Sequence, residues 1–456
     1  MKRLALLLAM ILLAACGTLE HDTRQDAPPV PAGWRTSVAP TSPVQRDWWT
    51  RFGDPELTRL VELALANNRD VATAAARVRE ARGQEAVARS QAFPSVDLAL
   101  AGTRSRNYNA LGQLSTTTTQ QNVFQASYEL DLFGRVAEGA AAARAGTEAS
   151  EAARDAAALS VAAATASGYI TLRALDERLA ILQRTVTSRE EAMRVARRRA
   201  QVGYTSALEM RQAEADYENT ALQVPQTLLA IERQEHALAL LTGSPPMEIH
   251  RGLQLTAMPP PPVPDSLPSA LLRGRPDIAQ AERALVAADA NLAVARAQFL
   301  PTVRLTASAG TLAVTRLPQA AIWTMGFSVL QPIFEGGRIA GQVDTTAARR
   351  DEAAYTYQRT VLTAFREVED NLSALVRTRE QRAHLEAEVA ALSDALFHAT
   401  RRYQAGYASY LDQLEAQRGE LNAELAAVQA TADELNVLVA LAQAVGGGWT
   451  APGWAP

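Results

Sequence analysis

The 456-residue sequence has a single cysteine, Cys16, only 5% aromatic residues and a formal net charge of −4. With one thiol, the chain forms no intramolecular disulfide. The absence of excess positive charge argues against a nucleic-acid partner. The five histidines show no metal-ligand spacing, and the sequence lacks an HExxH motif and a phosphate-binding glycine loop. We therefore expect neither enzymatic activity nor a cofactor.

The N-terminus has the pattern of a targeting segment. Lys2-Arg3 precedes an apolar stretch, Leu4–Leu13, that is too short to span a bilayer. The next residues end in Ala14-Ala15-Cys16, similar to the bacterial lipoprotein signal, in which the cysteine is lipidated and becomes residue one. Gly17 stands where an aspartate signals inner-membrane retention, so the resemblance implies the outer membrane. The alternative is an ordinary signal peptide with an incidental cysteine.

Proline is absent from two runs of equal length, residues 135–202 and 338–405. Ala, Leu, Glu, Arg and Gln fill both runs, and these are strong helix formers. At 1.5 Å per residue, each run predicts a helix of about 100 Å. Such a helix is stable only if its apolar stripe is buried on neighbouring helices along its length. The sequence therefore predicts a long, packed helical assembly.

The two halves of the chain repeat one pattern. Residues 89–96 align with residues 296–303 at an offset of 207, and the ends of the two proline-free runs align at an offset of 203. A nearly constant offset indicates internal duplication. The expected segments are a signal peptide (1–15), a lipid-anchored Pro-rich tether (16–47), a first repeat (48–243), a Pro-rich linker (244–268), a second repeat (269–446) and a tail (447–456). Each repeat is predicted to contain a helix, a β-hairpin (about 95–131 and about 302–332), the long helix and a shorter return helix. The first helix is expected to start at Asp54-Pro55, with Asp54 as its N-cap, and to run over about residues 56–91.

Both predicted hairpins show alternation with a period of two. In the first, apolar side chains at Val96, Leu98 and Leu100 alternate with polar or small ones, and the polar stretch 104–121 is expected to be a loop. In the second, Trp323 to Val329 alternate in the same way. An apolar face opposite a small, polar face is typical of a membrane barrel. The alternative is a soluble sandwich with one face on a core.

Four strands from one chain cannot close a barrel, and lipid does not tolerate open sheet edges. Two chains would supply eight strands, whose side chains fill the interior, whereas three chains supply twelve and leave a lumen. We therefore predict a homotrimer that is mainly α with a membrane β-barrel part. Its 12-stranded β-barrel would be continuous with a long α-helical barrel, each chain being internally duplicated.

Several motifs make the chain closely similar to the TolC-like outer-membrane efflux factors, in particular the lipoprotein branch with OprM-like and NodT-like proteins. The motifs are Trp48-Trp49 with Phe52 and Asp54, Arg273–Ile278, Ala297–Pro301, Gln331–Arg338 and Gly446–Trp449. The resemblance implies the exit duct of a tripartite pump, joined to a periplasmic adaptor and an inner-membrane transporter of the RND type. It places the barrel in outer-membrane lipid and the helices in the periplasm. Where relatives commonly carry Asn-Pro-Asp, this chain has Asn67-Asn68-Arg69-Asp70, which should affect a helix start.

Two near-identical turns, containing Gly203-Tyr204 and Gly406-Tyr407, follow the long helices. Glycine after a helix permits the left-handed conformation that reverses the chain. By resemblance, these tips also contact the adaptor and form the closed periplasmic entrance.

Four further residues are candidates for that gate. Asp412 and Glu415 share one helix face, which by itself fits a solvated acidic surface. The resemblance instead implies two acidic rings near the entrance constriction, and we expect these rings to filter or bind cations there. It also makes Tyr403 and Glu209 a candidate hydrogen-bonded pair between neighbouring coils, although Tyr403 fits a packing aromatic equally well. The basic partner of a second such link is replaced by Ala408.

A structural coiled-coil lipoprotein of the outer membrane without a pore remains the alternative from another class. It accounts for the long helices and the lipid. It does not account for the alternating hairpins.

Overall fold

A computed structural model describes residues 28–36, 44–108, 110–264 and 268–450. Cys16 and its neighbours, expected to carry the signal peptide and lipid, lie outside the described residues. The contacts divide the chain into two compact units. One comprises Ala76–Glu151 and Gln280–Arg359, and the other comprises Pro28–Ala75, Ala152–Ala279 and Thr360–Pro456. Each unit draws on both repeats, so the Pro-rich linker does not mark the boundary between them.

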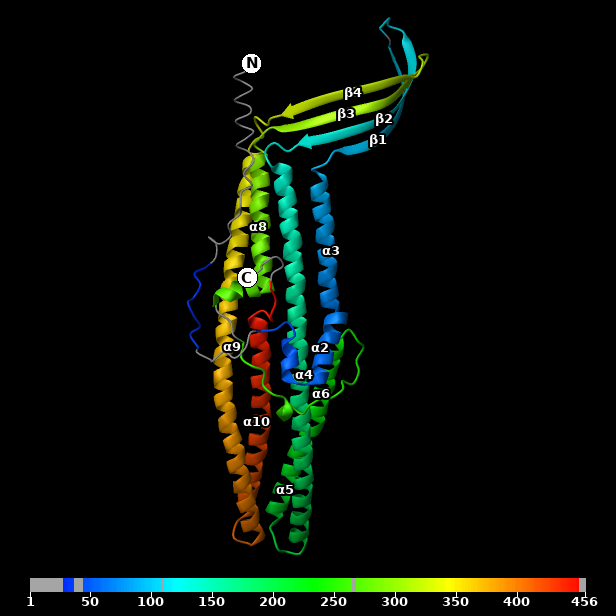
Figure 1. Cartoon of the computed structure of the whole chain (residues 1–456). Helices are drawn as coiled ribbons and strands as arrows, with labels where there is room; N and C mark the ends of the chain where they lie inside the picture. The colour runs from blue at the N-terminus through cyan, green and yellow to red at the C-terminus, as the bar shows by residue number, and fades with distance from the viewer. Residues whose placement is uncertain (1–27, 37–43, 109, 265–267, 451–456) are drawn as a thin grey trace. The chain divides into compact units, whose positions relative to one another are not determined.

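The first unit contains a four-stranded antiparallel sheet in the order β1-β2-β3-β4 (Figure 1). Its strands are β1 (Ser95–Tyr108), β2 (Leu114–Leu130), β3 (Thr302–Val314) and β4 (Ala320–Leu330). β2 pairs with β3, which joins the hairpins of the two repeats. Among the described residues, β1 and β4 each pair along one side only.

The polar stretch 104–121 is not the loop that the alternation predicted. β1 and β2 pair continuously from Ser95 opposite Ser127 to Tyr108 opposite Leu114. Threonine is β-branched and fits a pleated strand well. Here both faces of the hairpin are polar, so the apolar alternation stops although the strands continue.

The apolar row of each hairpin faces outward in the single chain. Leu98 on β1 and Trp323, Met325 and Phe327 on β4 are more than half exposed. A soluble sandwich would bury such a row against a second layer. These strands therefore need an apolar environment that the described residues of a single chain do not supply.

The long helices are α4 (Arg135–Gln201) and α9 (Arg338–Gln404), each ending one residue before its predicted bound. In the first unit they lie beside α3 (Arg69–Ser90) and α8 (Pro276–Ala297). Ion pairs connect these helices: Arg82 of α3 lies 2.6 Å from Glu151 of α4, and Arg350 of α9 lies 3.0 Å from Asp289 of α8. Charged side chains thus take part in the contacts between neighbouring helices.

The second unit adds α2 (Pro55–Asn67), α5 (Ala207–Ala221), α6 (Gln223–Leu241), α7 (Pro268–Gly274) and α10 (Tyr410–Ala444). Short 3₁₀ helices η2 (Trp48–Phe52) and η3 (Leu255–Ala257) complete it. The continuous helix expected from residue 56 to 91 is two helices, because Asn68 is extended and caps α3. Its Oδ1 accepts hydrogen bonds from the backbone N–H groups of Asp70 and Val71 at 2.8 and 3.2 Å. The unusual Asn68 therefore does act at a helix start.

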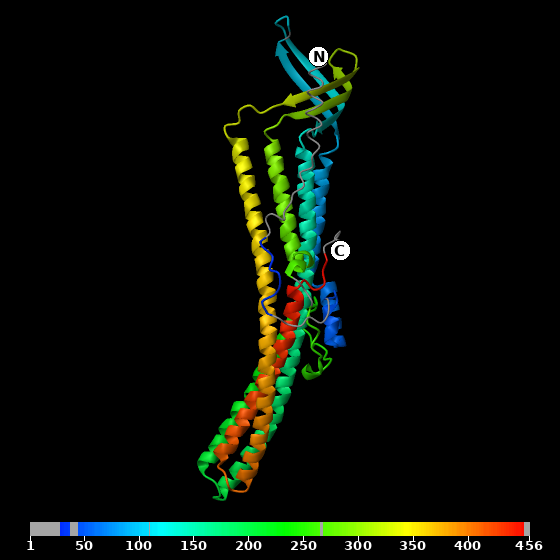
Figure 2. The same cartoon turned by 60° about the vertical axis from the view of Figure 1, so that its left-hand side comes forward.

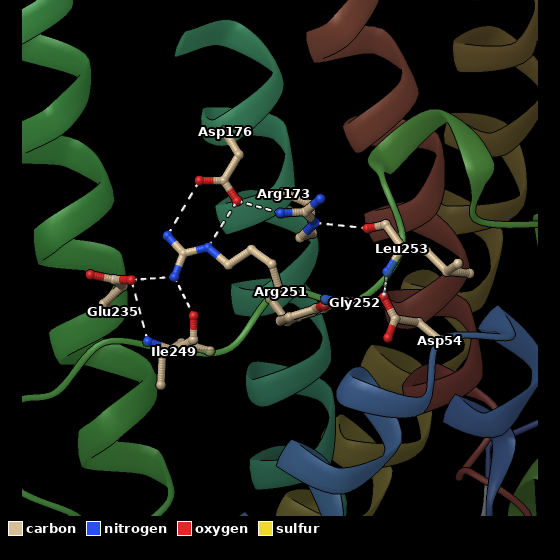
Figure 3. Close-up of polar contacts among 9 residues, drawn as sticks. Asp54, Arg173, Asp176, Glu235, Ile249, Arg251, Gly252 and Leu253 are labelled. Atoms are coloured by element: carbon tan, nitrogen blue, oxygen red, sulfur yellow. Dashed lines mark hydrogen bonds and ion pairs between the residues drawn. The ribbon is translucent and has the colours of Figure 1, made fainter. Parts of the chain in front are cut away.

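The linker after α6 is packed and not free. Arg251 donates to Asp176 on α4 and to Glu235 on α6 (Figure 3). The Asp54 carboxylate, at the start of α2, accepts from the backbone N–H of Leu253 at 2.8 Å. Four apolar side chains of the linker are almost fully buried: Ile249, Leu255, Met258 and Val263. The linker thus holds α2, α4 and α6 together.

Part of the expected tether is also attached. The backbone N–H groups of Arg35 and Thr36 donate to the Glu369 carboxylate of α9, at 3.1 and 2.7 Å. Trp34 packs edge-on against Phe365, with ring centroids 6.3 Å apart. In a free tether these two N–H groups would be hydrogen-bonded to water, and here the Glu369 carboxylate takes the place of that water.

Candidate functional site

Two turns of matching geometry lie next to each other in the second unit (Figure 2). After α4, Gly203 has φ 77° and the N–H of Tyr204 donates to the carbonyl of Arg199 at 2.8 Å. After α9, Gly406 has φ 79° and the N–H of Tyr407 donates to the carbonyl of Arg402 at 2.8 Å. The left-handed conformation predicted for both glycines is confirmed. It reverses the chain without the steric cost that a Cβ would bring.

Both turns present apolar side chains to solvent. Tyr204 is 85% exposed and Tyr407 is 81% exposed. Val202 and Leu208 beside the first turn and Leu411 beside the second are also exposed. A cluster of exposed apolar side chains is typical of an interaction surface.

The two candidate gate carboxylates lie in the first turns of α10 and are exposed. Asp412 forms a capping box with Ser409, because its Oδ2 accepts from the Ser409 backbone N–H at 2.9 Å while its own N–H donates to the Ser409 hydroxyl at 3.3 Å. Glu415 follows one turn later on the same face. Asp412 therefore has a structural role in addition to the one that the resemblance implies.

Tyr403 and Glu209 are not hydrogen-bonded to each other among the described contacts. The Tyr403 ring packs on Tyr410, with centroids 5.6 Å apart, and the Arg199 guanidinium lies 5.3 Å from its centroid. The Glu209 Oε2 atom is buried and has no hydrogen-bond partner within the described part of the chain. The proposed link between the two residues stays a prediction.

An apolar cluster joins the helices behind the turns. Ala196 of α4, Ala213 of α5 and both Tyr410 and Leu414 of α10 are buried together. Burial, and next the nearby Asp216 carboxylate, raise the pKa of the Tyr410 phenol to about 12. The phenol is therefore neutral at physiological pH.

Next to this cluster lies a buried ionic group that the sequence reasoning missed. The Asp216 carboxylate of α5 forms an ion pair with Arg189 of α4 at 2.5 Å and accepts a hydrogen bond from Arg418 of α10 at 2.7 Å. Arg189 and Asp216 are 3% and 2% exposed. One signal was available, because Asp216 falls between buried Ala213 and Thr220 on the inward stripe of α5. A carboxylate there needs a buried partner.

The sequence model of the outer membrane efflux protein family matches residues 60–244 and 267–447. The chain belongs to this family. The two matched ranges correspond to the two repeats.

Relatives in this family share nearly the full length of the chain. The toluene efflux pump outer membrane protein TtgC of Pseudomonas putida is 32% identical over 462 residues, covering 98% of this chain and 95% of TtgC. Outer membrane protein OprJ of Pseudomonas aeruginosa is also 32% identical, with coverage of 98% and 95%.

Solved structures agree with the fold. The CmeC outer membrane channel of Campylobacter jejuni superimposes with a TM-score of 0.87 at 28% identity, covering 92% of each chain. The MtrE outer membrane channel of Neisseria gonorrhoeae gives 0.80 at 30% identity, covering 92% of this chain and 98% of MtrE. The chain is thus an outer-membrane efflux channel protein with the TolC-like fold, combining helical-barrel and β-barrel parts, and its family consists of channels, not enzymes.

Proposed function

We propose that three copies of this chain form the exit duct of a tripartite pump. The duct passively conducts substrates to the exterior from a periplasmic adaptor and an inner-membrane transporter of the RND type. The observation that carries the proposal is the four-stranded sheet, which has an exposed apolar face and whose edge strands, β1 and β4, pair along one side only within the described residues. Lipid tolerates neither edge, and pairing β4 of one copy with β1 of the next removes both.

We also propose that Cys16 is lipidated and anchors the N-terminus in the outer membrane. The support is the Leu13-Ala14-Ala15-Cys16 sequence at the end of the signal-like segment. Mass spectrometry of the mature protein should find acyl chains on an N-terminal Cys16. An N-terminus processed elsewhere, with Cys16 unmodified, would leave the protein held by its barrel alone.

The two turns are proposed to be the tips that meet the adaptor at the periplasmic entrance. Their support is the exposure of Tyr204 and Tyr407 beside Gly203 and Gly406. A photo-crosslinking residue placed at Tyr204 or Tyr407 should capture the adaptor in intact cells. The same residue at exposed Tyr108 of β1 is the matched control and should not capture it. Equal capture from all three positions would contradict this assignment.

Asp412 and Glu415 are proposed to form a cation filter at the entrance, with six carboxylates contributed by three copies. Concentrated negative charge in a constriction attracts cations. The test is the ion selectivity of single channels carrying Asp412→Asn with Glu415→Gln. Cation preference should fall, whereas Glu62→Gln, an exposed acid on α2, should leave it unchanged. Unchanged selectivity in the double variant would remove the filter from the proposal.

Recording from the unaltered protein in planar bilayers tests the duct itself. Discrete current steps from a trimeric preparation are expected. A pore-less coiled-coil lipoprotein would give no current in any variant, and that result would replace the duct with a structural role.

A further inference from the structure

The first β-hairpin extends beyond the second one (Figure 1). The pairing of β2 with β3 stops at Thr119 opposite Val314, whereas β1 and β2 stay paired as far as Tyr108 opposite Leu114. The register between β1 and β2 is the same over their whole length, so no bulge interrupts it. Even-numbered residues of both strands therefore share one face throughout. This face carries Leu98 and is here named the outward face.

The outward face carries no charge over about the height of a bilayer core. On β2 it is uncharged from Leu130 to Gln120, the partner of Gly102 on β1. At about 3.4 Å per residue this stretch is about 34 Å long, and in a strand tilted by about 40° it covers about 26 Å of height. The apolar band of outer-membrane barrels is about 25 Å tall. The outward residue that follows Gly102 on β1 therefore lies at the edge of the hydrocarbon layer.

That residue is Arg104, and Arg106 follows it on the same face. Both side chains are exposed, and neither forms an ion pair within the part of the chain that the structure describes. On the outward face of the four described strands they are the only charged side chains, whereas Asp97, Glu129 and Arg304 lie on the opposite face. Charge of a single sign at one edge of an uncharged band fits an anionic layer at that level.

Polar and aromatic side chains surround the two arginines. Thr118 lies opposite Arg104 and Thr116 lies opposite Arg106, and both threonines are exposed. Tyr108, the next outward residue of β1, is 72% exposed. Successive outward side chains of a strand are about 7 Å apart. These five residues, here named the headgroup site, thus present two guanidinium groups, two hydroxyls and one aromatic ring on a single face.

The headgroup site has the chemistry that recognises a phosphorylated sugar. A guanidinium group donates two parallel hydrogen bonds to phosphate oxygens, and threonine hydroxyls donate further ones. An aromatic ring such as that of Tyr108 packs on the C–H face of a sugar. The outer leaflet of a bacterial outer membrane consists largely of a glycolipid whose phosphates lie next to its acyl chains, with further sugars beyond them. The strand has the same order, since both arginines come before the aromatic ring when counted from the uncharged band.

We propose that the headgroup site binds the phosphorylated glycolipid of the outer leaflet. Arg104 and Arg106 hold its phosphate groups, and Tyr108 contacts its sugars. This inference rests on the proposed duct, because the outward face meets lipid in a closed barrel. It adds to that proposal a specific lipid ligand for each copy of the chain.

The test measures binding of fluorescent lipid A, the phosphorylated glycolipid itself, to the detergent-solubilised full-length protein. An arginine next to an anionic lipid surface contributes about 1 kcal/mol, or about fivefold in affinity. Arg104→Gln with Arg106→Gln should therefore weaken binding about 25-fold, and each single variant about fivefold. Arg104→Lys with Arg106→Lys keeps both charges and should retain most of the affinity. Arg304→Gln is the matched control, because it removes an exposed arginine from the opposite face of the same sheet and should leave the affinity unchanged.

Two further ligands separate the lipid from a free anion. Lipid A without its phosphates should bind the unaltered protein about as weakly as intact lipid A binds the double glutamine variant. Inorganic phosphate at the same concentration should not displace bound lipid A, because it lacks the sugars and acyl chains. Displacement by inorganic phosphate would show a small-anion site and would overturn the lipid assignment.

Equal affinity of the unaltered protein and the double glutamine variant would also overturn the inference. An equal loss in Arg304→Gln would do the same, because it would show attraction to the overall charge of the sheet. If the double variant does not assemble, the two single variants decide the outcome by their expected fivefold losses. If the unaltered protein conducts no current while lipid A binding still depends on Arg104 and Arg106, the duct fails and the headgroup site stands. If it conducts and binding does not respond to these arginines, the duct stands and the headgroup site fails.

Discussion

Gly252→Ala should destabilise the second unit, because a side chain at this position has no space. A Cβ on Gly252 would lie 2.1 Å from Oδ1 of Asp54 and 2.7 Å from its Oδ2 and Cγ atoms. Asp54 is 1% exposed and its side chain is short, so the carboxylate would have to leave its position. The substitution thus acts through Asp54 (Figure 3).

The size of the effect follows from the contacts of that carboxylate. Oδ1 accepts from the N–H groups of Glu56 and Leu57 at 2.8 and 3.3 Å, which caps α2. Oδ2 accepts from the Leu253 N–H at 2.8 Å and the Tyr169 hydroxyl at 3.1 Å. Loss of a cap costs about 1 kcal/mol. The Leu253 N–H and the Tyr169 hydroxyl, left unsatisfied, each cost about 1 kcal/mol at the lower end of the usual range, so the total should be about 3 kcal/mol.

Thermal unfolding of the detergent-solubilised protein measures this effect. At about 2–4 °C per kcal/mol, Gly252→Ala should lower Tm by about 6–12 °C. Gly83→Ala is the matched control, because its Cβ meets nothing within 4 Å and the residue lies inside α3. Alanine favours a helix over glycine by about 1 kcal/mol, so this variant should melt at or above the original temperature. A Gly252→Ala protein with the same Tm as the unaltered protein would refute the role given to Asp54.

Three further predictions concern α10 and its neighbours. The pKa of Tyr410 is about 12 in the folded protein and 10 in an unfolded chain, so the free energy of unfolding should stay constant below pH 10 and fall as the pH rises from 10 toward 12. Melting curves over this range should show a smaller fall in Tm for Tyr410→Phe. Glu434→Gln should destabilise α10 by about 2 kcal/mol in chemical denaturation, since the buried carboxylate pairs with Arg379 at 2.9 Å and Arg382 at 3.1 Å and both partners keep some solvent. Ser409→Ala removes a helix cap and should cost about 1 kcal/mol, seen as faster amide exchange in the first turn of α10 and nowhere else.

Local signals in the sequence predicted much of the fold. The absence of proline from residues 135–202 and 338–405 predicted α4 and α9 nearly to the residue, because proline both removes a hydrogen bond and blocks a helix. The Asp54-Pro55 pair predicted the start of α2, where Asp54 is indeed the cap. The glycines of the two turns predicted left-handed conformations, which the backbone adopts.

Local sequence patterns did not predict the features that depend on contacts between residues far apart in the chain. The stretch 104–121 was interpreted as a loop because its strands lack an apolar face, and only their pairing reveals them. The helical pattern runs through Asn68 without a break, whereas in the structure its side chain caps α3 and also donates to the carbonyl of Leu241, 173 residues away. The spacing of Asp216 with Ala213 and Thr220 puts it on the inward stripe of α5, but its partners Arg189 and Arg418 come from two other helices and could not be read from that spacing.

Single-channel recording with the purified protein in planar bilayers tests the central claim most directly. The part of one chain that the structure describes supplies a four-stranded sheet with unpaired edges at β1 and β4, and such a sheet cannot enclose a pore alone. The account predicts discrete current steps from a preparation whose mass corresponds to three chains. A monomeric preparation that leaves the bilayer electrically silent would contradict it.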